Sequence, residues 1–294
     1  MEKVVATIQL HFDGDIAAGH QIPIRVLGQS LMHIQKAIDR AYLDIKYGGV
    51  WKNARMKTED YEMSEFIAQA PSEGGYIFDF FSSMNISSNI VDRVSSAINE
   101  AKLQASIQVE LIKDQARSFK ESIANKLIMP ISYAESLSIG NDDVKRVYGD
   151  RSIAKEIDQV IAPLRQDYSG DSNLIMLFAG ESSQKFEFNR VSSKKFHRVV
   201  SRRTLSKPII YKGKLKALDK LNLQGKFENT ESNRISFIYF ENESDFLQAH
   251  PYLGTDSDMC FIGSPILEFG SVEPNAGDIY FLNIVDTNNF NEVV

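Results

Sequence analysis

The stretch SLMHIQKAIDRAYLDI, residues 30–45, has the clearest secondary-structure pattern in the chain. Its apolar residues recur every three or four positions, which predicts a helix with one buried face. Ser30 belongs to the residue types that cap helix N-termini, and Gly48-Gly49 supplies a left-handed stop after the last apolar position. The pattern therefore predicts one amphipathic helix that covers a neighbouring element.

Alternating apolar and polar residues on either side of this helix predict strands. The expected strands are Val4–Phe12, Gln21–Leu27, Tyr61–Ala70 and Gly75–Phe81. Residues 1–85 are therefore expected to form a β-β-α-β-β domain, in which one helix covers an antiparallel sheet.

The middle of the chain changes to a helical period. Apolar residues step by three or four from Val94 to Leu127, which predicts one long helix or two helices in series. Shorter helices are expected over Asp142–Tyr148 and Ser152–Tyr168. Residues 86–170 are thus expected to be a helical segment. Two interpretations of its apolar stripe stay open, because the stripe can pack within the chain or form a dimer.

The last part of the chain, residues 171–294, returns to a period of two. Short strand candidates follow one another between Gly, Asn, Ser and Pro residues, which is typical of a small β-barrel or a curled sheet. They are Leu174–Phe178, Lys185–Asn189, Pro208–Lys212, Leu215–Leu223, Arg234–Phe240, Met259–Ile262, Pro265–Phe269 and Asp278–Val285. The expected fold class is α+β: an N-terminal antiparallel sheet with one covering helix, a helical middle segment, and a C-terminal small β-barrel-like domain.

Composition is that of a globular protein, with 43% hydrophobic and 24% charged residues among 294. No apolar run approaches the roughly 18 residues that span a bilayer, so no membrane association is expected. The N-terminus does not resemble a secretory signal, and the single cysteine, Cys260, excludes an internal disulfide. A cytoplasmic location is therefore expected, with Cys260 buried and inert.

Charge is distributed unevenly, and the unevenness suggests a function. Residues 190–218 contain ten Lys or Arg and no Asp or Glu, although the whole chain has a net charge of −6. Clustered cations attract an anionic partner, and interleaved aromatic residues suit single-stranded nucleic acid. The expected nucleic-acid-binding residues are Arg190, Lys194, Lys195, Phe196, His197, Arg198, Arg202, Arg203, Lys207, Tyr211, Lys212, Lys214 and Lys216.

The same charges allow a second hypothesis. From Phe227 to the end the chain carries twelve acidic residues and one basic residue, Arg234. These acids can neutralise the basic segment within the same domain, or they can pair with it across subunits. The protein would then assemble with itself as a homo-oligomer or with a protein partner.

A third hypothesis is a metal-dependent hydrolase or nuclease built on His11, Asp13, Asp15 and His20. The Asp-Gly-Asp sequence is also ordinary turn chemistry, which favours a structural role. Phosphate-binding, dinucleotide-binding and nucleophile-elbow motifs are absent from the sequence. The expected function is therefore a non-enzymatic binding protein, with no cofactor, no metal and no catalytic residue assigned.

Overall fold

The computed structural model describes residues 5–51, 54–71, 75–105, 111–138, 141–271 and 277–285, without the side chains of 141–147. The chain divides into two compact units, and each consists of two separate stretches. Unit 1 comprises Met1–Ile107 with Lys145–Ser201, and unit 2 comprises Gln108–Val144 with Arg202–Val294. This division differs from the expected segments 1–85, 86–170 and 171–294, because residues distant in sequence pair in both units.

Unit 1 is built on an antiparallel sheet with the strand order β2-β3-β1-β5-β6. Its strands are β1 (Ala6–Asp13), β2 (Ile67–Ala68), β3 (Tyr76–Ser82), β5 (Asn173–Ala179) and β6 (Ser183–Asn189). The central strand β1 pairs with β3 on one side and with β5 on the other. The strands predicted near 174–178 and 185–189 therefore exist, but they complete the N-terminal sheet and do not belong to the barrel.

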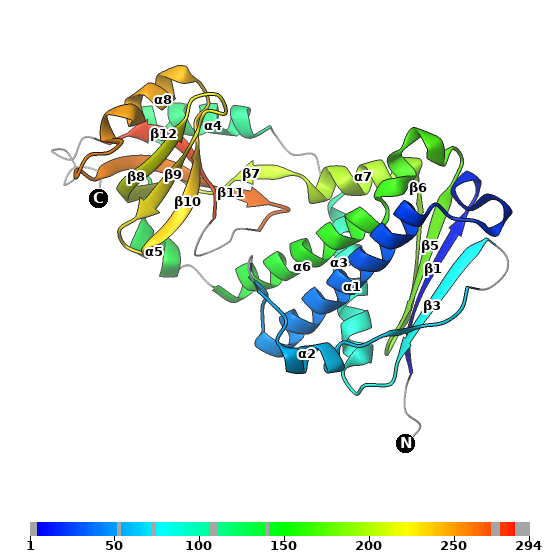
Figure 1. Ribbon diagram of the computed structural model, residues 1–294. Coiled ribbons are helices and arrows are strands. Elements are labelled where there is room, and N and C mark those ends of the chain that lie inside the picture. Colours follow the sequence, from blue (N-terminus) through cyan, green and yellow to red (C-terminus); the bar gives the residue numbers. More distant parts are fainter. Residues whose placement is uncertain are drawn as a thin grey trace. The chain divides into compact units, whose positions relative to one another are not determined.

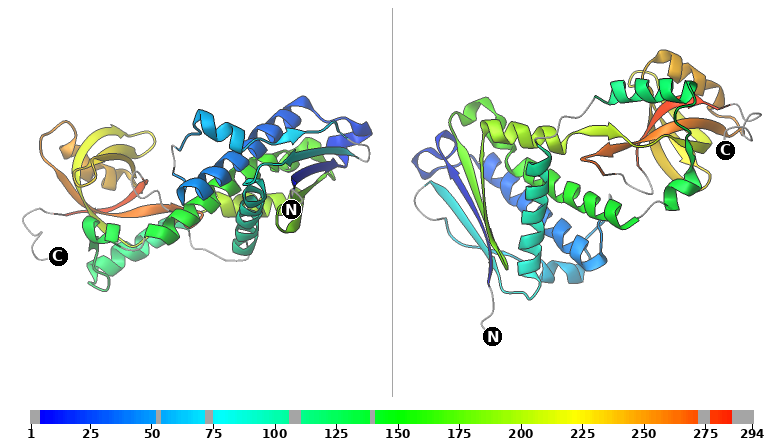
Figure 2. Two further views of the ribbon diagram at one scale, coloured as in Figure 1. Left: turned by 90° about the horizontal axis from the view of Figure 1, so that it is seen from below. Right: turned by 180° about the vertical axis from the view of Figure 1, so that it is seen from behind.

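Helices cover one face of this sheet, as Figures 1 and 2 show for α1, α3 and α6. They span Ile24–Tyr47, Ser87–Gln104 and Asn141–Val160. The predicted helix is confirmed as α1, and Gly48 ends it with a φ of 63°. The helix begins earlier than expected, since Pro23 is its N-cap and Ile24 is its first residue. The strand expected at 21–27 is therefore largely the first turn of α1.

One further prediction in unit 1 needs correction. The strand expected over 61–70 is the short helix α2 (Thr58–Met63) followed by the two-residue strand β2. Residues 190–200, the first part of the basic segment, had no predicted secondary structure and form the helix α7 (Arg190–Val200). The 3-10 turns η1 (Asp15–His20), η2 (Ala162–Arg165) and η3 (Asp167–Ser169) complete the unit.

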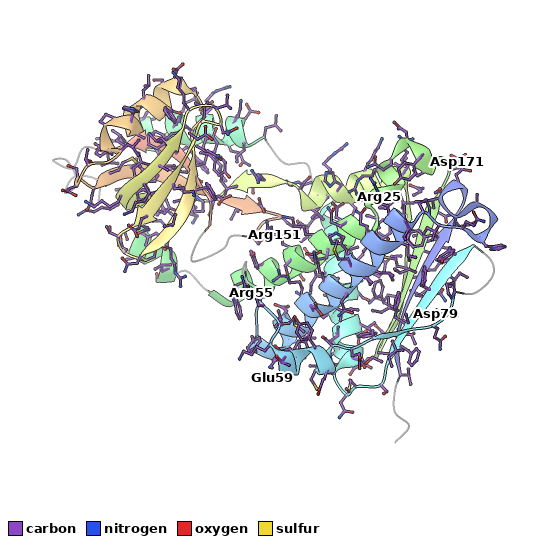
Figure 3. All side chains as sticks on the ribbon, viewed as in Figure 1. Arg25, Arg55, Glu59, Asp79, Arg151 and Asp171 are labelled. Carbon is purple, nitrogen blue, oxygen red and sulfur yellow. The ribbon has the colours of Figure 1, made fainter. Side chains whose placement is uncertain are left out.

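The two faces of the sheet differ in polarity. On β1, the alternate residues Ala6, Ile8, Leu10 and Phe12 are buried against the helices. On the opposite face, the side-chain amide of Gln9 donates to Asp79 Oδ1 at 2.8 Å, and Figure 3 labels Asp79 on β3. The helical stripe of α3, including Val94, Ile98 and Ala101, is fully buried within this unit.

Unit 2 is a closed five-stranded barrel. Its strands are β8 (Ile209–Asp219), β9 (Gln224–Asn229), β10 (Arg234–Tyr239), β11 (Met259–Glu268) and β12 (Ile279–Ile284). They follow the order β8-β9-β10-β12-β11, and β11 pairs with β8 to close the ring. Strands β10 and β12 run parallel, and the other neighbours run antiparallel. This connectivity, with α8 (Glu243–Ala249) between β10 and β11, is that of the oligonucleotide/oligosaccharide-binding (OB) fold.

Short elements flank the barrel. They are α4 (Ile112–Ala124), β4 (Ile131–Ser132), α5 (Tyr133–Ser138), β7 (Arg203–Leu205) and η4 (His250–Tyr252). Apolar residues of α4, among them Ala116 and Phe119, pack against a barrel cluster that contains Cys260. Of the apolar stripe that suggested dimerisation, Val94, Ile98 and Ala101 of α3 are buried in unit 1 and Ala116 of α4 is buried in unit 2, whereas Leu127 is 77% exposed.

The interior of the barrel is aromatic. Phe227, Phe261 and Phe281 are fully buried, and the rings of Phe227 and Phe261 lie edge to face with centroids 5.0 Å apart. Cys260 is 1% exposed, and burial raises the pKa of its thiol. Among the described residues, no helix is both long and apolar enough to cross a lipid bilayer.

Candidate nucleic-acid interface

The basic segment is divided between the two units, since residues 190–201 belong to unit 1 and residues 202–218 belong to unit 2. In unit 1 it forms α7, which begins at a reciprocal cap. The side chain of Asn189 accepts a hydrogen bond from the Ser192 backbone N–H at 2.9 Å, and Ser192 Oγ accepts from the Asn189 backbone N–H at 2.8 Å. This pair fixes where the helix starts. Asn189 and the apolar spacing of Phe196, Val199 and Val200 are the sequence signals that predict this helix.

The inner face of α7 is anchored by a buried carboxylate. Asp158 Oδ2 lies 2.9 Å from His197 Nδ1, and Asp158 Oδ1 accepts from Arg165 Nη1 at 2.8 Å. Ser193 Oγ donates to the Ile161 carbonyl at 3.0 Å. His197 is therefore engaged by a carboxylate of its own unit, although about half of its side chain is exposed.

The outer face of α7 carries exposed cations. Lys194, Lys195 and Arg198 are exposed and lie at a spacing of three and four residues, on one side of the helix. Within the described part of the chain, no carboxylate pairs with any of the three. Arg190, at the start of the helix, instead pairs with Asp167.

The aromatic residues of the basic segment are core residues. Phe196 is 2% exposed, and its ring lies edge to face against Phe188 at 5.5 Å. Tyr211 is 4% exposed and packs against Phe227 and Phe261, and burial raises the pKa of its hydroxyl. Phe196 is part of the core of unit 1 and Tyr211 is part of the core of unit 2, so neither ring is presented to a nucleobase.

In unit 2, most basic residues of the segment lie beside acids of the same unit. Arg203 Nη2 is 2.9 Å from Glu268, Lys214 Nζ is 3.2 Å from Asp258, and Lys216 Nζ is 2.7 Å from Glu228. Lys212 lies 3.8 Å from the same Asp258 carboxylate. Arg202 also has an interaction partner. Lys207, which precedes β8 in the chain, is exposed. Charge pairing within one chain thus accounts for much of this half of the segment.

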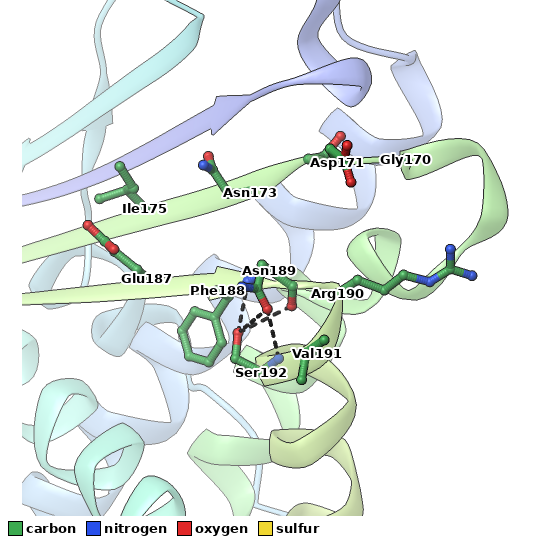
Figure 4. A pocket seen from close by; sticks show the side chains of 11 residues that line it. Gly170, Asp171, Asn173, Ile175, Glu187, Phe188, Asn189, Arg190, Val191 and Ser192 are labelled. Carbon is green, nitrogen blue, oxygen red and sulfur yellow. Dashed lines mark hydrogen bonds between the residues drawn. The ribbon is translucent and has the colours of Figure 1, made fainter.

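A polar pocket of about 600 Å³ opens at the start of α7, lined by residues 170–173, 175 and 187–192. Figure 4 shows the hydrogen bonds between Asn189 and Ser192 there, with the Arg190 side chain extending away from them. The Oδ1 atom of Asn173 is buried and has no hydrogen-bond partner among the described residues. Asp171 and Glu187 also line the pocket, so its wall carries both signs of charge.

Three of the four residues of the metal hypothesis, Asp13, Asp15 and His20, contact backbone groups. Asp13 Oδ1 accepts from the Gly14 N–H at 2.8 Å, and Asp15 Oδ2 accepts from the Asp171 N–H at 3.1 Å. His20 Nδ1 lies 3.0 Å from the Gly75 carbonyl oxygen. In the residues that the structure describes, no group of three or more His, Cys, Asp or Glu side chains is placed to hold a metal ion.

A second polar cluster lies between α1 and α6. His33 Nδ1 is 2.6 Å from Glu156 Oε2, and burial raises the pKa of the nearby Asp39 carboxyl. Asp39, Arg40 and Glu156 line a pocket of about 180 Å³. This volume is below the roughly 300 Å³ at which small-molecule sites begin, so the cluster is better explained as a surface ion network.

Compared with known proteins, the chain matches no family model and has no significant similarity to any curated protein.

Proposed function

We propose that this protein binds nucleic acid without catalysing a reaction on it, and that α7 contacts the phosphate backbone. The observation that carries the proposal is the exposed triplet of Lys194, Lys195 and Arg198, which has no carboxylate partner in the described part of the chain. Cations that already have partners gain little from a phosphate, since the ion pair must first be broken. Unpaired cations in one row release counterions from a polyanion at no such cost.

The barrel adds support from its architecture. Five-stranded Greek-key barrels with this connectivity frequently bind oligonucleotides or oligosaccharides. A fold by itself does not determine a ligand, so this support is an analogy. The excess of cations on α7 favours a polyanion over a neutral sugar.

Self-assembly and a protein partner stay as alternative predictions. The carboxylates beside Lys214 and Lys216 come from the same chain, so these ion pairs do not require a second subunit. We therefore favour nucleic acid over charge pairing between subunits.

The test is a fluorescence-anisotropy titration with labelled oligonucleotides at several salt concentrations. The triple change of Lys194, Lys195 and Arg198 to Ser is expected to weaken binding and to reduce the slope of log affinity against log salt by roughly 2 to 3, since each phosphate contact contributes about 0.7–0.9.

A matched control changes Lys113, Arg117 and Lys126 to Ser, which removes three exposed charges in or just after α4. It is expected to leave both affinity and slope nearly unchanged. If the two triple variants bind alike, α7 is not the contact surface. If the wild-type chain binds no oligonucleotide at low salt, the proposed function is wrong.

A further inference from the structure

The connection between α1 and α2 presents aromatic rings at the surface of unit 1. Trp51, the only tryptophan, is 46% exposed, and Tyr47, the last residue of α1, is 41% exposed. The two rings meet edge to face, with centroids 5.9 Å apart. A tryptophan that completed the core would bury most of its indole, so the Trp51 ring is instead available to a ligand.

The backbone that carries Trp51 is anchored to unit 1. The Arg40 guanidinium of α1 donates to the carbonyl oxygens of Trp51 and Ala54, at 3.5 and 3.4 Å. The Ala54 N–H donates to the Trp51 carbonyl oxygen at 3.0 Å, and the side chains of Val50 and Ala54 are buried. A ring on an anchored backbone loses little conformational freedom when a ligand stacks on it, which favours binding.

The same connection is basic. Residues 45–58 contain four Lys or Arg and no Asp or Glu. Lys46 is paired with Asp60. Arg55, which Figure 3 labels, and Lys57 are exposed, and no carboxylate of a described residue pairs with either of them. Exposed rings therefore stand beside unpaired cations here, whereas the rings of the basic segment lie in the cores of the two units.

We infer that this surface, meaning Tyr47, Trp51, Arg55 and Lys57, binds single-stranded nucleic acid. An unpaired base stacks on the Trp51 ring, and Arg55 and Lys57 contact the flanking phosphates. A duplex keeps its bases paired and stacked on one another, so it cannot use the ring in this way. The inference rests on the proposed function, to which it adds the strandedness of the nucleic acid and a second contact surface in unit 1.

Charge decides between the possible occupants of the Trp51 surface. A neutral oligosaccharide also packs on aromatic rings, but it gains nothing from unpaired cations. A polynucleotide carries a base and a phosphate in every unit, which matches an exposed ring beside cations. Stacking of a base on one aromatic ring is expected to be worth about 5- to 100-fold in affinity.

The first test follows the fluorescence of Trp51 in the full chain, where no other tryptophan contributes. The protein is titrated with two oligomers of 20 phosphates: oligothymidylate and an abasic strand that has the same backbone without bases. Oligothymidylate is expected to quench the fluorescence, because a base stacked on the indole quenches its excited state. The abasic strand is expected to bind more weakly and to leave the fluorescence nearly unchanged. Binding of oligothymidylate without any change in Trp51 fluorescence would overturn the inference.

Substitutions at Trp51 then separate stacking from apolar contact, with binding followed by the anisotropy of labelled oligomers. Trp51→Ala is expected to lower oligothymidylate affinity about 5- to 100-fold and to leave the abasic strand unchanged. Trp51→Phe retains a ring and should keep most of the preference for oligothymidylate. Trp51→Leu is the matched control, since it is apolar but has no ring, and it should lose the preference as the Ala variant does. Equal affinities of the Phe and Leu variants for oligothymidylate would show that no base stacks at this position.

The outcomes separate this inference from the proposed function. Binding that is lost in the α7 triple variant, but is indifferent to bases and to Trp51→Ala, keeps the proposed function and overturns the stacking surface. Equal losses for both oligomers in Trp51→Ala also overturn it, because backbone contact alone would then explain the effect. Quenching by a neutral glucan, with no response to oligothymidylate, would assign the Trp51 surface to sugars instead.

Discussion

Asp158 and His197 are joined by a contact of 2.9 Å between Oδ2 and Nδ1, and this contact ties the basic helix α7 to α6. The Asp158 side chain is only 3% exposed, and it also accepts hydrogen bonds from Arg165. One buried carboxylate therefore contacts both His197 and Arg165 beneath the helix surface that we propose to contact phosphates.

Asp158→Ala is expected to destabilise unit 1 by about 3 kcal/mol, because it leaves the largely buried Arg165 guanidinium without its carboxylate. Urea unfolding followed by the fluorescence of Trp51, the only tryptophan, measures this loss in unit 1. His197→Ala is the control, since it removes a half-exposed partner and should cost about 1 kcal/mol or less. Equal losses in both variants would show that Asp158 is not the anchor.

Arg93 is expected to be the most sensitive charged residue of the core of unit 1. Its Nε donates to Asp44 at 2.7 Å and its Nη1 donates to Asp150 at 2.6 Å, so that it links α3 to α1 and α6. Arg93→Met would leave two buried carboxylates facing each other without a cation, at a cost of about 3–5 kcal/mol. Urea unfolding measures the loss. The control Arg117→Ala removes an exposed guanidinium and should change stability by less than about 0.5 kcal/mol.

Asp60 is expected to contribute to stability in a pH-dependent way. Its carboxylate accepts from the Lys46 ammonium, from Tyr42 Oη at 3.1 Å and from the Lys57 N–H at 2.8 Å. These contacts, the Lys46 hydrogen bond first, hold the pKa of Asp60 below its ordinary value of 3.8. The same pair raises the pKa of Lys46 above 10.5.

A lowered folded-state pKa means that Asp60 stabilises the fold fully above pH 3.8, and that this contribution disappears as the pH falls through the folded value. Asp60→Asn should therefore be less stable than wild type at neutral pH, and the difference should shrink below about pH 4. Thermal unfolding at pH 7, 5, 4 and 3 measures the difference. A gap that stays constant to pH 3 would contradict the assigned role of the carboxylate.

Gly14 is expected to resist substitution for two separate reasons. Its φ is 82°, and a Cβ atom at this position would lie 2.8 Å from both the Asp171 carbonyl oxygen and the Ser172 Cα. Gly48 is the matched control, since its φ is 63° and nothing lies within 4 Å of its Cβ position. Gly48→Ala should cost about 1 kcal/mol for the left-handed backbone alone. Gly14→Ala should cost clearly more in urea unfolding, and equal costs would mean that the neighbouring backbone moves aside.

Local periodicity was enough to predict much of this fold. Helix α1 follows from the spacing of its apolar residues and from Gly48, and strands β1, β3, β10 and β12 follow from alternation. The small barrel follows from the number and spacing of short strands. Each of these features depends on residues close together in the chain, where side-chain period and turn chemistry act directly. The concentration of cations in residues 190–218 is likewise a property of the sequence.

Tertiary structure alone decided which strands pair and which charges remain unpaired. Strands β5 and β6 are evident as strands, but the pairing of β5 with β1 joins residues more than 150 positions apart, and no local pattern encodes such a partner. Tertiary structure also decides which cations have a carboxylate partner. Lys216 and Lys194 are alike in sequence, yet β9 brings Glu228 beside the first, and no described carboxylate reaches the second. Whether a cation is free to meet a phosphate depends on its spatial neighbours, because electrostatic energy falls with distance in space and not along the chain.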